Sequence, residues 1–286
     1  MYAEELTVPC VSQHIFINPE IIALWMEQTY SLEKYLFVLT IVITVVLFQY
    51  LIPTKNLFLD LFTIYIIPIL FISVFFGRLI IEKSFKNNKG ALIAMLISYS
   101  ISTIIASVLA FIIVILLLGF IPGSLYPLAR PSPQSGSSQA AIAMVIISLA
   151  IVGPAEEYIF RGFVFGALYF VLQRKHWLPI SIFSSIVFTV LHAYYYFTFG
   201  IASSIFFVQI FSISLAFSIA YFISGGNLLM PALIHGIYDA SAFLDFAAEG
   251  NIGAIIRSLI FLSGIILAIM VLIIKRPSLR KITSNL

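Results

Sequence analysis

The sequence predicts an all-helical bundle that crosses a membrane about eight times. Two observations predict this fold class. Hydrophobic residues make up 62% of the 286 residues and charged residues only 9%, whereas roughly a quarter of an ordinary soluble domain is charged. The hydrophobic residues also gather into runs that are long enough for spanning helices, which need about 20 apolar residues each.

Eight apolar runs are the candidate spans. The third and fourth runs are longer than an upright span requires, which predicts tilt, a kink or an end outside the bilayer. The candidate spans cover residues 35–52, 57–77, 90–121, 140–172, 178–198, 201–223, 228–247 and 253–274.

Composition divides the chain into five parts. Residues 1–34 lack the pattern of a cleavable signal peptide, and we expect a cytoplasmic or interfacial segment there, with a short interfacial helix. Residues 35–121 form N-terminal transmembrane helices without a motif. Residues 122–139, rich in Pro, Ser and Gly, predict a flexible loop. Residues 140–247 carry the intramembrane charges, and residues 248–286 form a last transmembrane helix and a basic cytoplasmic tail.

Basic residues predict the orientation of the chain. Eight spans place both termini on one side, together with three of the loops. The opposite side has Lys55 and Arg130, with Arg257 near a helix start. The positive-inside rule therefore places both termini in the cytoplasm, and we expect a multi-pass protein of the cell membrane. The basic residues on the predicted cytoplasmic side are Lys34, Arg78, Lys83, Lys86, Lys89, Arg174, Lys175, Lys275, Arg276, Arg280 and Lys281.

Ionisable residues inside the apolar runs are few and concentrate in the second half of the chain. Such residues are costly in hydrocarbon unless they are paired or hydrated, so they indicate a functional site by default. Asp60 in the second candidate span is the exception, because it sits near a helix end that water can reach. The residues of the second half are Glu156, Glu157, Arg161, His192, His235 and Asp239.

The stretch GPAEEYIFRG, residues 153–162, contributes three of these charges. Glu157 and Arg161 are four residues apart on a helix, which predicts an ion pair. Glu156 lies about 100° around the helix from Glu157 and is left over, facing elsewhere. Pro154 either starts a new helical segment with both glutamates in its first turn, or kinks a continuous helix. A packing network between helices would also explain the three charges, but an unpaired buried carboxylate argues against it.

Two histidines and an aspartate complete the set. His192 lies in the middle of the fifth candidate span and, taken alone, is more typical of a hydrogen-bonded core residue than of a catalytic one. His235 and Asp239 share one helix face, where an imidazole N–H donated to the carboxylate would fix the ring tautomer. An unpaired glutamate, two histidines and an aspartate on three spans together favour a site.

These residue types suit the hydrolysis of an acyl bond in a membrane cavity. A glutamate held away from bulk water is a stronger base, and beside a histidine it can deprotonate a water molecule. A second histidine can donate to the oxyanion of a tetrahedral intermediate. The same residues also make a zinc set, although an HExxH motif is absent and the single cysteine, Cys10, excludes a cysteine-rich site. The sequence contains no GxSxG motif, no Walker A motif and no basic nucleic-acid patch.

The motifs resemble those of the CPBP family of intramembrane proteases, which includes type II CAAX prenyl endopeptidases and bacteriocin-processing, bacteriocin-immunity and lysostaphin-resistance-like proteins. The family pattern is EExxxR, then FxxxH, then HxxxN or HxxxD, each in a transmembrane helix. Here these motifs are EEYIFR at 156–161, FTVLH at 188–192 and HGIYD at 235–239. The resemblance covers residues 140–242, and the N-terminal half agrees only in hydropathy.

The resemblance implies a role for each motif residue. Glu156 would be the general base, and His192 would help to hold the catalytic water. His235 and the residue at 239 would serve the oxyanion. The residues that would shape the site are Glu157, Arg161 and Phe188.

Asp239 departs from the asparagine that CAAX-processing members commonly have at this position. An ionised aspartate cannot donate a hydrogen bond to an oxyanion. Asp239 is therefore protonated, orients a charged His235, or binds a metal. We expect no cofactor. In the metal-dependent alternative, zinc would be held by Glu156, His192, His235 and Asp239.

The main prediction is an intramembrane endopeptidase that acts on a membrane-associated peptide or protein, prenylated or not. Its surroundings would be the lipid bilayer, and no nucleic-acid partner is expected. A second interpretation is a catalytically inactive membrane scaffold or bacteriocin-immunity protein with the same fold. A third is a proton-coupled transporter, because buried Glu, His and Asp also build proton relays. The lack of an internal repeat argues against a transporter.

Overall fold

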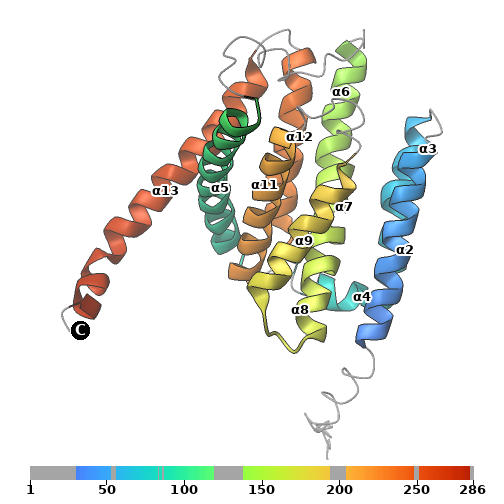
Figure 1. Ribbon diagram of the computed structural model, residues 1–286, viewed down its shortest axis with the longest axis horizontal. Coiled ribbons are helices and arrows are strands. Elements are labelled where there is room, and N and C mark those ends of the chain that lie inside the picture. The colour runs from blue at the N-terminus through green and yellow to red at the C-terminus, as the bar shows by residue number, and fades with distance from the viewer. Residues whose placement is uncertain are drawn as a thin grey trace, which may run out of the picture.

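In a computed structural model, the chain folds into a bundle of helices (Figure 1). The structure describes residues 30–52, 56–82, 84–85, 87–118, 138–193, 204–247 and 251–283. Within these ranges there is no β-strand, which confirms the predicted all-helical class.

Two of the described helices combine α-helical segments with wider π-helical segments, which are labelled η. Residues 57–81 and residues 138–171 each form one continuous helix made of such segments. The elements are α2 (Leu32–Leu51), α3 (Leu57–Leu61), η1 (Phe62–Ile66), α4 (Ile67–Ile81), α5 (Asn88–Leu118), α6 (Ser138–Ile147), η3 (Ser148–Val152), α7 (Gly153–Glu157), η4 (Tyr158–Ala167), α8 (Leu168–Val171), α9 (Trp177–Leu191), α11 (Ser204–Ile223), α12 (Leu229–Ala247) and α13 (Ile252–Thr283).

Every predicted span contains a helix, but not every helix is long and apolar enough to cross a membrane by itself. In the described part of the chain, α9 and α11 contain shorter apolar stretches, Trp177–Leu191 and Phe207–Ile223. Helix α12 occupies the seventh predicted run. The predicted count of eight spans is therefore not confirmed. The five stretches long enough to span are Leu32–Gln49, Leu57–Ile81, Asn88–Ile113, Gln139–Val171 and Ile252–Ile274.

Two of the predicted segments lie largely outside the described residues. The interfacial helix expected within residues 1–34 is one of them, although α2 already begins at Leu32, where the side chain of Ser31 accepts a hydrogen bond from the N–H of Lys34. The flexible loop expected at 122–139 is the other, and α6 begins at its end.

Each of the two composite helices changes from π to α geometry just before a proline. Segment η1 precedes α4, whose second residue is Pro68, and η3 precedes α7, whose second residue is Pro154. A proline lacks the N–H of a regular turn and its ring clashes with the preceding turn, and a wider turn relieves this clash. Pro154 therefore lies inside a continuous helix and does not start a separate one.

The first helices pack against the half of the chain that carries the motifs. Figure 1 shows α2 and α4 along one side of the bundle, α5, α11 and α12 in its middle, and α13 leaving the other side at an angle. The rings of Tyr35 and Phe163 lie 5.0 Å apart, and those of Phe76 and Phe163 5.3 Å apart. The Tyr35 hydroxyl donates to the carbonyl oxygen of Val164 at 3.0 Å. These contacts join α2 and α4 to η4.

The start of α2 and the end of α13 lie at the same end of the bundle (Figure 1). An even number of crossings requires such an arrangement, and the cytoplasmic side remains a prediction from the basic residues.

Two glycines allow α7 and α12 to approach closely. A Cβ atom on Gly153 would lie 2.6 Å from the backbone nitrogen of Gly236 and 2.8 Å from the carbonyl oxygen of Ala232. A Cβ atom on Gly236 would lie 3.0 Å from the carbonyl oxygen of Ser148. Backbone atoms cannot move aside as a flexible side chain can, and small residues commonly enable such contacts between membrane helices. The glycines therefore set the distance between the helix of the glutamates and that of His235.

We expect Gly153→Ala to destabilise the protein, because the added methyl group must push α7 away from the α12 backbone. Overpacking of this kind costs about 1–3 kcal/mol. Thermal unfolding in detergent should show a midpoint several degrees lower than that of the parent. Ile146→Ala is the matched control on the same composite helix, since Ile146 is 60% exposed and should shift the midpoint little. Equal midpoints for Gly153→Ala and the parent would contradict the tight crossing.

Candidate active site

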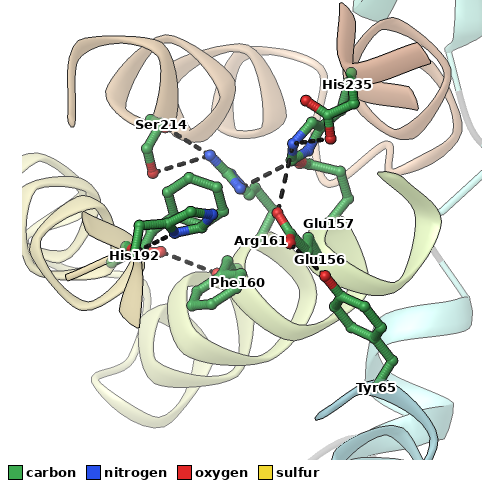
Figure 2. Close-up of polar contacts among 11 residues, drawn as sticks. Tyr65, Glu156, Glu157, Phe160, Arg161, His192, Ser214 and His235 are labelled. Carbon is green, nitrogen blue, oxygen red and sulfur yellow. Dashed lines mark hydrogen bonds and ion pairs between the residues drawn. The ribbon is translucent and has the colours of Figure 1, made fainter. Parts of the chain in front are cut away.

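Glu157 and His235 form the contact at the centre of the site (Figure 2). The imidazole Nδ1 lies 2.7 Å from Glu157 Oε1. A carboxylate oxygen accepts, so Nδ1 carries the hydrogen and donates it. The other ring nitrogen, Nε2, lies 3.5 Å from Glu156 Oε2 and 3.5 Å from Asp239 Oδ2. One histidine therefore faces three carboxylates that come from two helices.

The hydrogen bond expected between His235 and Asp239 is not the one that fixes the ring. Asp239 Oδ2 stands 3.5 Å from Nε2, whereas Glu157 Oε1 approaches Nδ1 to 2.7 Å. The close crossing of α7 and α12 brings a carboxylate from another helix nearer than the one on the same helix. The tautomer of His235 is therefore set by Glu157, which corrects the expectation from spacing.

Arg161 neutralises Glu157 and ties it to two further helices. Its Nη1 lies 3.0 Å from Glu157 Oε1, and both side chains are fully buried, as the spacing of four residues predicts for an ion pair. Its Nη2 donates to Ser214 on α11, at 2.9 Å to the hydroxyl and 3.1 Å to the carbonyl oxygen. The guanidinium carbon lies 4.9 Å from the ring centre of Phe188 and 5.1 Å from that of Phe217. Arg161 is thus held by charge, hydrogen bonds and aromatic faces together.

Glu156 does not face away from this network. Its Oε1 accepts a hydrogen bond of 2.8 Å from the hydroxyl of Tyr65 in η1, and its Oε2 faces His235 Nε2 at 3.5 Å. Its side chain is 9% exposed. The two glutamates therefore face the two nitrogens of one imidazole ring. Side chains at adjacent helix positions point in different directions, and both reach His235 because α12 crosses close to α7.

His192 lies at the end of a helix and not in the middle of a span. Helix α9 ends at Leu191, and His192 is its C-terminal cap. The sequence placed His192 in the middle of a span because an apolar run does not reveal where a helix ends. The ring Nδ1 lies 2.7 Å from the carbonyl oxygen of Phe188, so Nδ1 carries the hydrogen and Nε2 accepts in the neutral ring.

Phe188 stands between the two histidines. Its ring centre lies 4.4 Å from that of His192 and 6.0 Å from that of His235. The same ring lies under the guanidinium of Arg161. The side chain expected to shape the site thus contacts three of the other expected site residues.

The charges of the cluster do not balance without a shared proton. Glu156, Glu157 and Asp239 supply three carboxyl groups, against one guanidinium and one imidazole. Even with a charged imidazole, one negative charge remains in surroundings that disfavour it. With the imidazole charged, one further proton shared between Glu156 and Asp239 would make the cluster neutral. Groups that share a proton in this way can exchange it with a substrate.

Residues 138–241 match the family model described as Type II CAAX prenyl endopeptidase Rce1-like. We call this matched segment the Rce1-like domain. It contains the three motifs and every site residue that the sequence predicts. No curated protein and no solved structure matched the chain. The family is one of proteases, which supports, at the level of the family, an intramembrane endopeptidase.

The Rce1-like domain does not present an evident metal site. Among the described residues, no group of three or more His, Cys, Asp or Glu side chains is arranged to hold a metal ion. Of the residues expected to hold zinc in the metal-dependent alternative, His235 and His192 each donate through Nδ1, as histidines that bind a metal through Nε2 also do. Because the described residues do not form a set of three metal ligands, the reaction proposed below uses protein groups alone, and a zinc requirement stays a prediction.

Some residues of the site carried no signal that could be recognised in the sequence. Tyr65 lies outside the Rce1-like domain in a half without a motif, and only Pro68, three residues later, marks its helix as distorted. Ser214 and Phe217 are residues of kinds that are common in apolar helices. A glycine such as Gly153 predicts close packing of a membrane helix, but it does not show which helix is the partner.

We expect Arg161→Met to destabilise the protein strongly, because it leaves Glu157 as an uncompensated buried charge. Breaking a buried pair in this way costs about 3–5 kcal/mol. The double variant Arg161→Met with Glu157→Gln should recover part of the loss in a thermal or denaturant unfolding assay.

The matched control for this experiment is Arg78→Met. Arg78 pairs with Glu82 at the same spacing and at 2.9 Å, but the two side chains are 77% and 58% exposed. An exposed pair contributes at most about 1 kcal/mol. Similar losses for the two single variants would contradict the importance of burial for the Glu157–Arg161 pair.

Proposed function

We propose that the chain is an intramembrane endopeptidase in which Glu156 activates the attacking water molecule. The observation that carries this proposal is that Glu156 and Glu157 engage opposite nitrogens of His235 inside a nearly closed site. The two carboxylates then have different tasks. Glu157 contacts Arg161 and Nδ1 of His235. Glu156 and Asp239 both lie near Nε2 of His235.

In the first step, Glu156 takes a proton from water and the oxygen attacks the peptide carbonyl carbon. Negative charge develops on the carbonyl oxygen. His235 in its charged form carries a hydrogen on Nε2 and donates it to this oxyanion. Glu157 stabilises the charged imidazole through Nδ1, as the 2.7 Å hydrogen bond supports. The proton on Glu156 then passes to the leaving amine as the carbon–nitrogen bond breaks.

His192 would accept from the water through Nε2, because its Nδ1 donates to the Phe188 carbonyl. Asp239 would stabilise the charged form of His235 and would not donate to the oxyanion itself. Its side chain is 29% exposed, against 8% for that of His235, so it lies on the more open side of the cluster. This role accounts for an aspartate in place of asparagine at position 239 and does not require a metal.

The substrate in this proposal is a peptide segment of a membrane-associated protein. The family name refers to prenylated CAAX sequences, and a panel that contains matched prenylated and unmodified peptides would decide whether this chain requires the lipid. Cleavage should be followed with purified protein in detergent and in lipid vesicles. The new termini should be identified by mass spectrometry.

We expect Glu156→Gln to lose cleavage by about 10²–10⁴-fold, the usual contribution of a general base, while the protein remains folded. Initial rates on the best peptide of the panel give the measurement. Glu33→Gln, at an exposed position in the first turn of α2, should cleave like the parent. Parent-like rates for Glu156→Gln would exclude Glu156 as the base and favour an inactive scaffold or another mechanism.

We expect Asp239→Asn to keep cleavage within about tenfold of the parent, since an asparagine oxygen can still accept from His235 and the net loss is at most that of one ordinary hydrogen bond, about 0.5–1.5 kcal/mol. The same assay, combined with analysis of bound zinc, checks this. Complete loss of cleavage, together with loss of stoichiometric zinc, would instead assign the carboxylate of Asp239 to a metal.

A further inference from the structure

Tyr65 reaches the catalytic glutamate from outside the Rce1-like domain. Its hydroxyl donates to Glu156 Oε1 at 2.8 Å, across 91 positions of the chain. In Figure 2 its side chain comes in from a separate helix and ends at the Glu156 carboxylate. The site at residues 156–239 is therefore completed by a helix of the N-terminal half.

The local backbone explains how Tyr65 comes to face Glu156. Tyr65 lies in the π-helical segment η1, three residues before Pro68, and η1 packs against α7. Glu156 lies two residues after Pro154, which follows the π-helical segment η3. The wider turns change which side chains face the neighbouring helix, and π-helical turns frequently occur at functional sites. Both helices thus contain a π-helical segment at or next to the residue that forms this hydrogen bond.

The hydrogen bond is not needed to join the two helices. Helix α4 is already linked to η4 by the hydroxyls of Tyr158 and Ser73, which lie 2.9 Å apart, and by the packing of Phe76 against Phe163 at 5.3 Å. A tyrosine that served only packing could do so as phenylalanine. The Tyr65 hydroxyl instead ends on a carboxylate that is 9% exposed.

A donor on one oxygen gives the two oxygens of Glu156 different environments. Oε1 is occupied by a neutral hydroxyl, and Oε2 faces the ionisable groups His235 and, beyond it, Asp239. We infer that Tyr65 is a positioning residue for Glu156: it fixes Oε1, so that Oε2 is the oxygen that exchanges the proton. This inference rests on the proposed function, in which Glu156 is the base.

The test compares Tyr65→Phe with Tyr158→Phe. Each variant removes one hydroxyl from a hydrogen bond between the same two composite helices, but only Tyr65 contacts Glu156. For Tyr65→Phe we expect kcat about tenfold lower with KM within about twofold of the parent, because binding groups are untouched and the base is misplaced. Tyr158→Phe should keep both constants within about twofold.

A second readout does not depend on cleavage. Dicyclohexylcarbodiimide modifies protonated carboxyl groups in apolar surroundings, and peptide mass spectrometry locates the label. The Tyr65 hydroxyl covers Oε1 and holds the carboxyl group in place. At one fixed pH, labelling of Glu156 should therefore be several-fold faster in Tyr65→Phe than in the parent. Labelling in Tyr158→Phe should follow the parent.

These two readouts separate the inference from the proposed function. Parent-like labelling in Tyr65→Phe overturns the inference, whatever the cleavage rates. Faster labelling of Glu156 with parent-like kcat also overturns it, because the contact then has no part in the reaction. If the parent cleaves no peptide, faster labelling in Tyr65→Phe supports the contact of Tyr65 with Glu156 and counts against the protease function alone.

Discussion

The rest of the site depends on the burial of one carboxylate, that of Glu157. Its Oε1 lies 3.0 Å from Arg161 and 2.7 Å from His235, and its side chain has no exposure. Such a charge is tolerable in the membrane interior only when its partners are held in place. Ser214, Phe188 and Phe217 hold the arginine, and the Gly153–Gly236 crossing holds the histidine. Glu156 is the more exposed of the two glutamates, and it is not part of the Glu157–Arg161 ion pair.

The two halves of the chain contribute differently to this arrangement. The Rce1-like domain supplies the carboxylates, imidazoles and guanidinium of the cluster, and helices α2 and α4 pack against η4 through an aromatic cluster. That packing also brings Tyr65 to Glu156. The N-terminal helices are therefore part of the immediate surroundings of the site, although no motif marks them. A separated segment 138–241 would lack both the aromatic contacts and the tyrosine.

The sequence predicted what depends on one helix and missed what depends on how helices cross. Apolar runs identify the helical membrane protein, and spacing within one helix predicts the Glu157–Arg161 pair. The partner of His235 was assigned to Asp239 because spacing compares only residues of the same helix. The contact with Glu157 requires two glycines on different helices to meet. The end of α9 before His192 was not predicted either, because hydropathy does not encode where a helix ends.

The order of the charged residues along the chain has a consequence for biosynthesis. Glu157 and Arg161 lie within one turn of the same helix, so this pair can enter the bilayer already neutral during translation. Tyr65 precedes Glu156 by 91 positions, whereas His235 follows Glu157 by 78. When the helix with Glu156 is made, Tyr65 has already been synthesised and His235 has not. The contacts of both glutamates with His235 can therefore form only after α12 has been added to the chain.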